Sequence, residues 1–362
     1  MFHGSKRLLL FIALAACSRA DTAAVTFGAA GPWSEAYGEA NRKGIQLAVD
    51  DINASPEWAG KRHLVIRFEN DSGSGVVATS VAQRFVDDPT VVAVVGHVNS
   101  GAMVAAAHVY DKHLPAVATT ATSPALTGIS PWAFRVISSD SANGLTIAEF
   151  ANRLGRRRAA VLYENNPYGR GLADSFRRSF GGVIVSIDPI ADGAEQDFEP
   201  YVSWFKQQKL DIVFVAGTDA SGLAFLKEAR HQQLAADLVG GDGWQTLAGN
   251  DVAEGILVGA PFSADDKRPE VTAFVAAYKK KFDGAMPEGN VALAYDATKL
   301  LAAAVVKVGT DRGKIRDYLA ELSKPYAGVT GPIRFRPDGD PINKGIVMTR
   351  VRRGQLQLEG AR

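Results

Sequence analysis

Short apolar runs alternate with helical patterns along most of the chain. A strand buried in a parallel sheet reads as a short apolar run, whereas an amphipathic helix repeats apolar residues every three or four positions. This alternation predicts parallel sheets with helices on both faces. Strands are expected over 24–27, 64–68, 91–95, 116–119, 134–137, 159–163, 183–187, 212–215, 238–240 and 256–261. Helices are expected between them, over 38–52, 76–85, 103–110, 145–154, 171–180, 198–208 and 222–231.

The alternation breaks at 122–132, a stretch rich in Ser, Thr, Pro and Gly, and then restarts. A second series of the same build predicts a second α/β unit. At the end of the chain, two strand-like runs (331–336 and 345–352) flank the turn-rich stretch 337–341. We therefore expect two α/β lobes connected by several crossings of the chain. Three further helices are expected after Pro261, over 269–282, 291–308 and 312–322.

Composition and charge exclude several classes of protein. The chain has 362 residues, 46% of them hydrophobic and 22% charged, which is long enough for two globular domains. Its formal net charge is +1, so no basic excess indicates a nucleic-acid partner. The six histidines are scattered, and no Gly-x-Ser-x-Gly sequence is present. We expect no metal, no cofactor and no catalytic activity.

The N-terminus reads as a targeting segment. Lys6 and Arg7 precede an apolar run over 8–16 that is too short to span a bilayer. Small residues lead directly into Cys17, the only cysteine of the chain, as at the cleavage site of a bacterial lipoprotein. We expect residues 1–16 to be a lipoprotein signal peptide and Cys17 to be lipidated. The alternative is an ordinary secretory signal in which the cysteine stands by chance.

The stretch Gly96–Gly101, Gly-His-Val-Asn-Ser-Gly, stands between an expected strand and an expected helix. The N-terminus of a helix presents free backbone N–H groups and the positive end of a dipole, which suits a small anion such as a carboxylate. Similar strand–loop junctions lie near Thr120 and Tyr37. Together they predict a site for an amino acid or a similar small solute. Ser100 alone has a structural alternative, which is to cap the helix.

A series of motifs in a fixed order resembles the periplasmic type I solute-binding proteins of branched-chain amino acid ABC transporters. The resemblance runs from about Val25 to the C-terminal end. It implies a two-lobed α/β fold with Rossmann-like lobes, parallel-core sheets, three crossovers and no catalytic activity. The motifs are Gly31-Pro32 with Tyr37-Gly38, 48–53, Val94-Val95-Gly96-His97, 122–126, Asn166-Pro167-Tyr168-Gly169-Arg170-Gly171 and Gly241-Asp242-Gly243.

The resemblance also implies domain boundaries. The chain would form an anchor or linker over 17–24, a first lobe from 25–137 plus 262–336, and a second lobe from 138–261 plus 337–362. We place the three crossings near 136–139, 261–263 and 335–340.

The resemblance further implies a ligand site. Ser100, Thr122 and Thr120 match the residues with which the first lobe holds an α-carboxylate. Asp242 matches the acidic residue that binds the α-ammonium on the second lobe, although Asp-Gly alone would predict only a turn. The other positions implied to line the site are Tyr37 and Tyr168, for which packing is the structural alternative, together with Val98 and Thr218. Asp219 and Trp244 are expected beside them. An aromatic residue is expected near Thr218 in the family, and its absence argues against a branched-chain ligand.

We therefore expect a periplasmic, lipid-anchored, monomeric protein that captures an amino acid or close analogue between two lobes and delivers it to an ABC permease. A sensor or regulator of the same fold, reading a small amide, urea or another solute, is the alternative. A hydrolase is a weaker alternative, because the chain lacks a nucleophile–base pattern.

Overall fold

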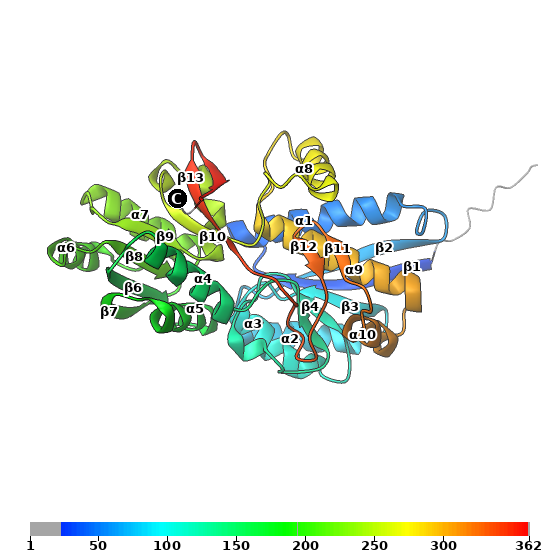
Figure 1. Ribbon diagram of the computed structural model, residues 1–362. Helices are drawn as coiled ribbons and strands as arrows, with labels where there is room; N and C mark the ends of the chain where they lie inside the picture. The colour runs from blue at the N-terminus through cyan, green and yellow to red at the C-terminus, as the bar shows by residue number, and fades with distance from the viewer. Residues whose placement is uncertain (1–22, 194, 361–362) are drawn as a thin grey trace, which may run out of the picture.

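The computed structural model describes residues 23–193 and 195–360, which form two α/β lobes side by side (Figure 1). The sheet of the first lobe is all parallel, in the order β2-β1-β3-β4-β5. Its strands are β1 (Ala23–Gly31), β2 (Arg62–Asn70), β3 (Val91–Gly96), β4 (Ala116–Ala118) and β5 (Ala133–Arg135). The lobe's other elements are α1 (Ala36–Ala54), α2 (Gly75–Asp87), α3 (Ser100–Tyr110), the short 3-10 helix η1 (Pro124–Leu126), α8 (Pro269–Lys281), α9 (Gly289–Val308), α10 (Arg312–Ala320) and the hairpin β11 (Tyr326–Gly328)–β12 (Gly331–Ile333).

The sheet of the second lobe has a parallel core, β7-β6-β8-β9-β10, with antiparallel β13 and β14 added at one edge. Its strands are β6 (Arg158–Glu164), β7 (Val183–Ile190), β8 (Ile212–Ala216), β9 (Asp237–Gly240), β10 (Leu257–Ala260), β13 (Val347–Arg352) and β14 (Gln355–Leu358). Its helices are α4 (Asp140–Arg153), α5 (Pro167–Ser179), α6 (Glu199–Gln207), α7 (Asp219–His231) and the 3-10 helices η2 (Asp242–Gly249) and η3 (Asp251–Ala253). The predicted fold class, two lobes with parallel-core sheets, is confirmed.

The pattern of apolar residues explains why both faces of the central strands are covered. Every residue of β3 is buried, and its alternate side chains enter different cores: Val94 packs against α2 and α3, while Val95 packs toward α9. In α1, the apolar residues Ile45, Leu47, Ala48 and Ile52 are all buried. The central strands are therefore covered on both faces, as a parallel sheet requires.

The C-terminal segment pairs differently from the simplest interpretation of the sequence. The runs 331–336 and 345–352 do not form one hairpin across the turn. Gly331–Ile333 pairs with Tyr326–Gly328 in the first lobe, whereas Val347–Arg352 pairs with β10 and β14 in the second. An isolated bridge between Phe335 and Pro341 closes the turn itself. Each run finds its partner in a different sheet, so the segment passes between the lobes.

The chain passes from one lobe to the other in three places: between β5 and β6, between β10 and α8, and between β12 and β13. The lobe boundaries given above stay a prediction. No helix within 23–193 or 195–360 has the length and apolarity needed to cross a membrane. Residues 1–16 and Cys17 lie outside the described part of the chain.

Candidate functional site

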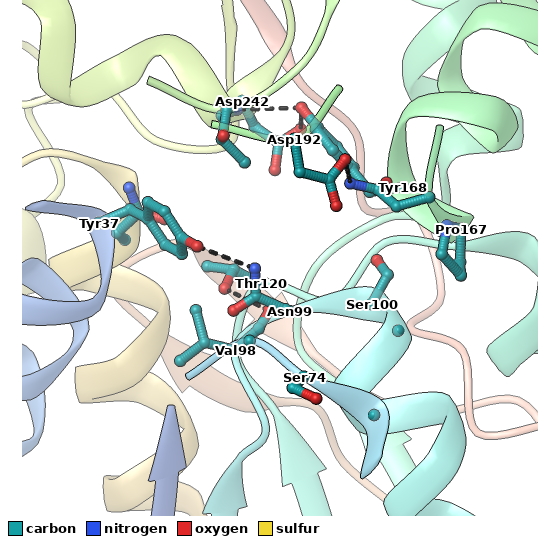
Figure 2. A pocket seen from close by; sticks show the side chains of 17 residues that line it. Tyr37, Ser74, Val98, Asn99, Ser100, Thr120, Pro167, Tyr168, Asp192 and Asp242 are labelled. Carbon is teal, nitrogen blue, oxygen red and sulfur yellow. Dashed lines mark hydrogen bonds between the residues drawn. The ribbon is translucent and has the colours of Figure 1, made fainter. Parts of the chain in front are cut away.

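A cavity of about 330 Å³ lies between the two lobes, at the carboxyl ends of the parallel strands (Figure 2). Its volume is at the small end for a ligand pocket, which suits a small solute. Both lobes supply its walls. The lining residues are Tyr37, Gly73, Ser74, Gly75, Val98, Asn99, Ser100, Gly101, Thr120 and Asn290 from the first lobe, and Asn166, Pro167, Tyr168, Asp192, Thr218, Asp242 and Gly243 from the second.

Ser100 begins α3 at the floor of the cavity, but it does not cap the helix. Asn99 occupies the N-cap position, and its side chain makes no capping hydrogen bond. The Ser100 Oγ instead accepts the backbone N–H groups of Thr122 and Ser123, each at 3.1 Å. Because these bonds occupy the acceptor positions of the hydroxyl, its own proton remains to be donated. Ser100 thus offers a hydrogen-bond donor to an anion, together with the first N–H groups of α3.

Thr122 is not among the residues that line the cavity, so the structure does not place it beside Ser100 as a ligand contact. Its side chain is fully buried, and its backbone carbonyl accepts the N–H of Asp140 at 2.9 Å. Its contribution to the site is the backbone N–H that Ser100 accepts. The loop continues with Ser123 as N-cap and Pro124 as first residue of η1.

Two further side chains shape the wall of the first lobe. Asn99 Nδ2 donates to the Tyr37 hydroxyl at 2.9 Å, and Thr120 Oγ1 donates to the Val98 carbonyl at 3.0 Å. Tyr37, Thr120 and Val98 all line the cavity, and their contact with a ligand stays a prediction. Asn99 was missed by the sequence interpretation, although its place directly before Ser100 was a usable signal.

A buried network fixes the loop that carries these residues. His97 Nδ1 lies 2.6 Å from Asp71 Oδ2, and His97 Nε2 lies 2.8 Å from the Tyr110 hydroxyl. All three side chains are fully buried. Asp71 also accepts the N–H of Gly73, which lines the cavity. His97 therefore joins two loops of the first lobe that border the same cavity.

Asp242 lines the opposite wall, from the second lobe. The Tyr168 hydroxyl donates to Asp242 Oδ1 at 3.1 Å and accepts the N–H of Gly243 at the same distance. Burial raises the pKa of Asp242 to about 6, although the bond from Tyr168 acts in the opposite direction. A Cβ on Gly241 would lie 2.8 Å from the Tyr168 hydroxyl. Glycine is required there by close approach, since its φ of −81° is ordinary.

The remaining expected residues divide between the cavity and the core. Thr218 lines the cavity, and its hydroxyl donates to the buried Glu164 at 2.7 Å. Asp219 does not line it; this side chain accepts the Thr246 hydroxyl at 2.8 Å. Trp244 is fully buried against Gly222 and Gly240, so the expectation that it lies beside the site is wrong.

The second lobe also contributes residues that the sequence did not reveal. Asn166 caps α5 and lines the cavity together with Pro167. Asp192 follows β7 and enters from the same side. Within the described residues, no group of three or more His, Cys, Asp and Glu side chains is placed to hold a metal ion.

Comparison with known proteins decides the family. A family model described as periplasmic binding protein matches residues 23–355. The chain belongs to the periplasmic binding protein family. It is thus a solute-binding protein and not an enzyme, and the family places it outside the cytoplasm.

Curated relatives of this periplasmic binding protein match it over most of their length and most of its own. An amino acid binding protein of Pseudomonas aeruginosa is 29% identical, with 87% of each chain covered. Leu/Ile/Val-binding protein homolog 1 of Brucella abortus is 26% identical over 88% of this chain and 87% of its own.

Solved structures of substrate-binding proteins also match this chain. The branched-chain amino acid transporter substrate-binding protein LivJ of Streptococcus pneumoniae, in complex with isoleucine, is 30% identical with a TM-score of 0.84, covering 92% of this chain and 98% of its own. An ABC transporter substrate-binding protein of Desulfitobacterium hafniense, in complex with Leu, is 28% identical with a TM-score of 0.80, covering 93% and 100%.

Proposed function

We propose that this protein captures an α-amino acid in the interlobe cavity and delivers it to the permease of an ABC transporter. The observation that carries the proposal is the opposed chemistry of the two walls. The first lobe presents hydrogen-bond donors at Ser100 and the start of α3, and the second lobe presents the Asp242 carboxylate. The relatives crystallised with isoleucine and leucine support the same class of ligand.

In this arrangement, the α-carboxylate of the ligand binds the Ser100 hydroxyl and the free N–H groups of α3, while the α-ammonium binds Asp242. Both charges must be compensated, because removing water from an unpaired charge costs several kcal/mol. Tyr168 holds the carboxylate of Asp242 in place, and Asn99 holds the Tyr37 ring at the opposite side.

Calorimetric titration and thermal denaturation with the common amino acids, amides and small carboxylates test the proposal. A ligand at 100 times its dissociation constant adds about 2.7 kcal/mol of stability. Replacing Asp242 with Asn removes a charge-assisted contact of about 1.5–3 kcal/mol, so we expect zwitterions to bind roughly ten- to hundredfold more weakly. Asp188→Asn, a change on β7 outside the cavity, is the matched control. Stabilisation by no zwitterion, or full affinity in Asp242→Asn, would contradict the proposal.

We also propose that the mature protein is anchored to the membrane through acylated Cys17. The small residues before the only cysteine support this assignment. Mass spectrometry of the protein isolated from membranes should find an N-terminal, lipid-modified Cys17. In Cys17→Ser, the protein should leave the membrane fraction. A mature N-terminus at another residue would exclude the anchor.

A further inference from the structure

The second lobe brings a further carboxylate into the cavity that the amino-acid head group does not use. Asp192 follows β7, and Figure 2 shows its carboxylate directed toward the space between the lobes, on the same side as Asp242. Its side-chain partner is the Asn166 amide, at 3.1 Å. No Lys, Arg or His stands among the residues that line the cavity in the described part of the chain. Asp192 therefore faces the ligand space without a compensating charge.

A third acid increases the negative charge of this wall. Glu164 is buried directly behind it and accepts hydrogen bonds from Asn166, the Thr218 hydroxyl and the Ser221 hydroxyl. These donors are all neutral, so they stabilise the carboxylate without cancelling its charge. Burial, and the negative charge of Glu164, raise the pKa of Asp192.

The wall of the cavity combines apolar and polar surface. Val98 and Pro167 are the purely apolar side chains that line it, and the two tyrosines add the edges of their rings. Trp244, which packs against Gly240, and Leu172, which packs against Gly241, are fully buried in the core of the second lobe. The methylene groups of an aliphatic or a cationic side chain can both pack on the apolar part of the wall, so it is the charge of the wall that distinguishes the two classes of ligand.

The two carboxylates on this wall of the cavity differ in burial, because Asp242 is buried whereas Asp192 remains accessible to solvent. The head group of an α-amino acid is neutral as a whole, and its ammonium is compensated by Asp242. An uncharged ligand side chain would leave the charge of Asp192 uncompensated, whereas a cationic side chain would form a charge-assisted hydrogen bond with it. We propose that the ligand is an α-amino acid with a cationic side chain, whose ammonium or guanidinium group binds Asp192. This assignment rests on the proposed function and names the ligand class of the same site.

Two pairs of ligands of matched shape isolate the side-chain charge. Lysine is compared with norleucine, and arginine with citrulline, by calorimetric titration at pH 7. We expect at least one cationic member to bind tenfold or more tightly than its neutral partner. In Asp192→Asn, that preference should fall below threefold. Asp188→Asn removes the same charge from β7 outside the cavity, and it should keep the full preference.

The outcomes separate this assignment from the proposed function. If norleucine or leucine binds the wild-type protein as tightly as lysine and arginine, or if glutamine or citrulline binds more tightly, the cationic ligand is refuted while amino-acid capture stands. A preference that survives in Asp192→Asn refutes the role of Asp192. If none of these amino acids binds, both proposals fail. Both proposals are supported if Asp242→Asn weakens the binding of every amino acid while Asp192→Asn removes only the preference for cationic side chains.

Discussion

Asp242 is a buried carboxylate that faces a cavity with no basic side chain among the described lining residues. Its only side-chain hydrogen bond within the described chain comes from Tyr168, a neutral donor. Burial without a cation is the reason that its pKa rises to about 6. An ammonium group from the ligand would supply the missing charge and favour the ionised form. Asp242 is thus placed to bind a cation, and without one its ionised form is disfavoured by burial.

Amino-acid affinity should therefore depend on pH. We expect affinity to increase as the pH rises from 5 to 7, because Asp242 must be ionised to pair with the ammonium. In the ligand-free protein, the effect of this group on folding stability has the opposite dependence on pH. The folded pKa of about 6 exceeds the ordinary 3.8, so the stability contributed by the bound proton is present below pH 4 and is lost as the pH rises through 6.

Calorimetric titration between pH 5 and 8 measures how amino-acid affinity depends on pH. The Asp242→Asn variant is the control, because Asp140 and Glu288 are also buried acids with raised pKa values and Asp140 faces Asp242. Affinity in the variant should change little over this range. A slope as steep as that of the wild type would assign the dependence to another acid.

At the scale of the element, the local sequence pattern predicts where each strand and helix lies along the chain. It does not predict which strands pair with one another. The run Val91–Val95 and the small polar loop after it predict both β3 and the start of α3, since apolar burial and helix initiation are local. Asp192 could not be found this way. It reaches the cavity only because β7 pairs with β6, which places the end of β7 beside Asn166. The strand at 355–358 was missed for the same reason, since it exists only as the partner of β13.

The resemblance located residues that pattern alone would leave ambiguous. Asp242 reads as a turn residue in isolation, and the structure places it in the cavity wall. The resemblance also implied Thr122, which the structure buries behind the wall. The observed contacts of Thr122 with this region are made by its backbone, whose N–H binds the Ser100 hydroxyl and whose carbonyl accepts the N–H of Asp140.

The His97 network should control two loops at once. His97→Ala leaves Asp71 and Tyr110 buried without their shared partner, so we expect a loss of about 3–5 kcal/mol in unfolding free energy and weaker amino-acid binding. Tyr110→Phe removes one hydrogen bond and keeps the ring, so it should cost about 1 kcal/mol. Urea denaturation and calorimetric titration measure both. Equal costs in the two variants would show that the bond between His97 and Asp71 is not the main support.

The two lobes are joined by three passages of chain, and one ion pair links two of them. Arg135, at the end of β5, donates to Asp340 at 2.6 Å across 205 positions of sequence. The guanidinium also donates to the carbonyls of Thr122 and Ser123, whose N–H groups bind Ser100. The connection between the lobes and the floor of the site therefore share one buried side chain. No local motif predicts this pair, because its members meet only in the folded molecule.

Closure of the two lobes should follow from contacts that the ligand makes with both. A ligand shifts a conformational equilibrium only through the difference between its affinities for the two states. A ligand held by Ser100 alone would bind the open and closed forms about equally, whereas one that also contacts Asp242 favours the closed form. Small-angle X-ray scattering should therefore show a smaller radius of gyration when the wild-type protein is saturated with the amino acid that stabilises it most. Asp242→Asn at saturation should show little compaction, and Asp188→Asn should compact fully. Equal compaction in Asp242→Asn would mean that closure is driven by contacts other than the ammonium.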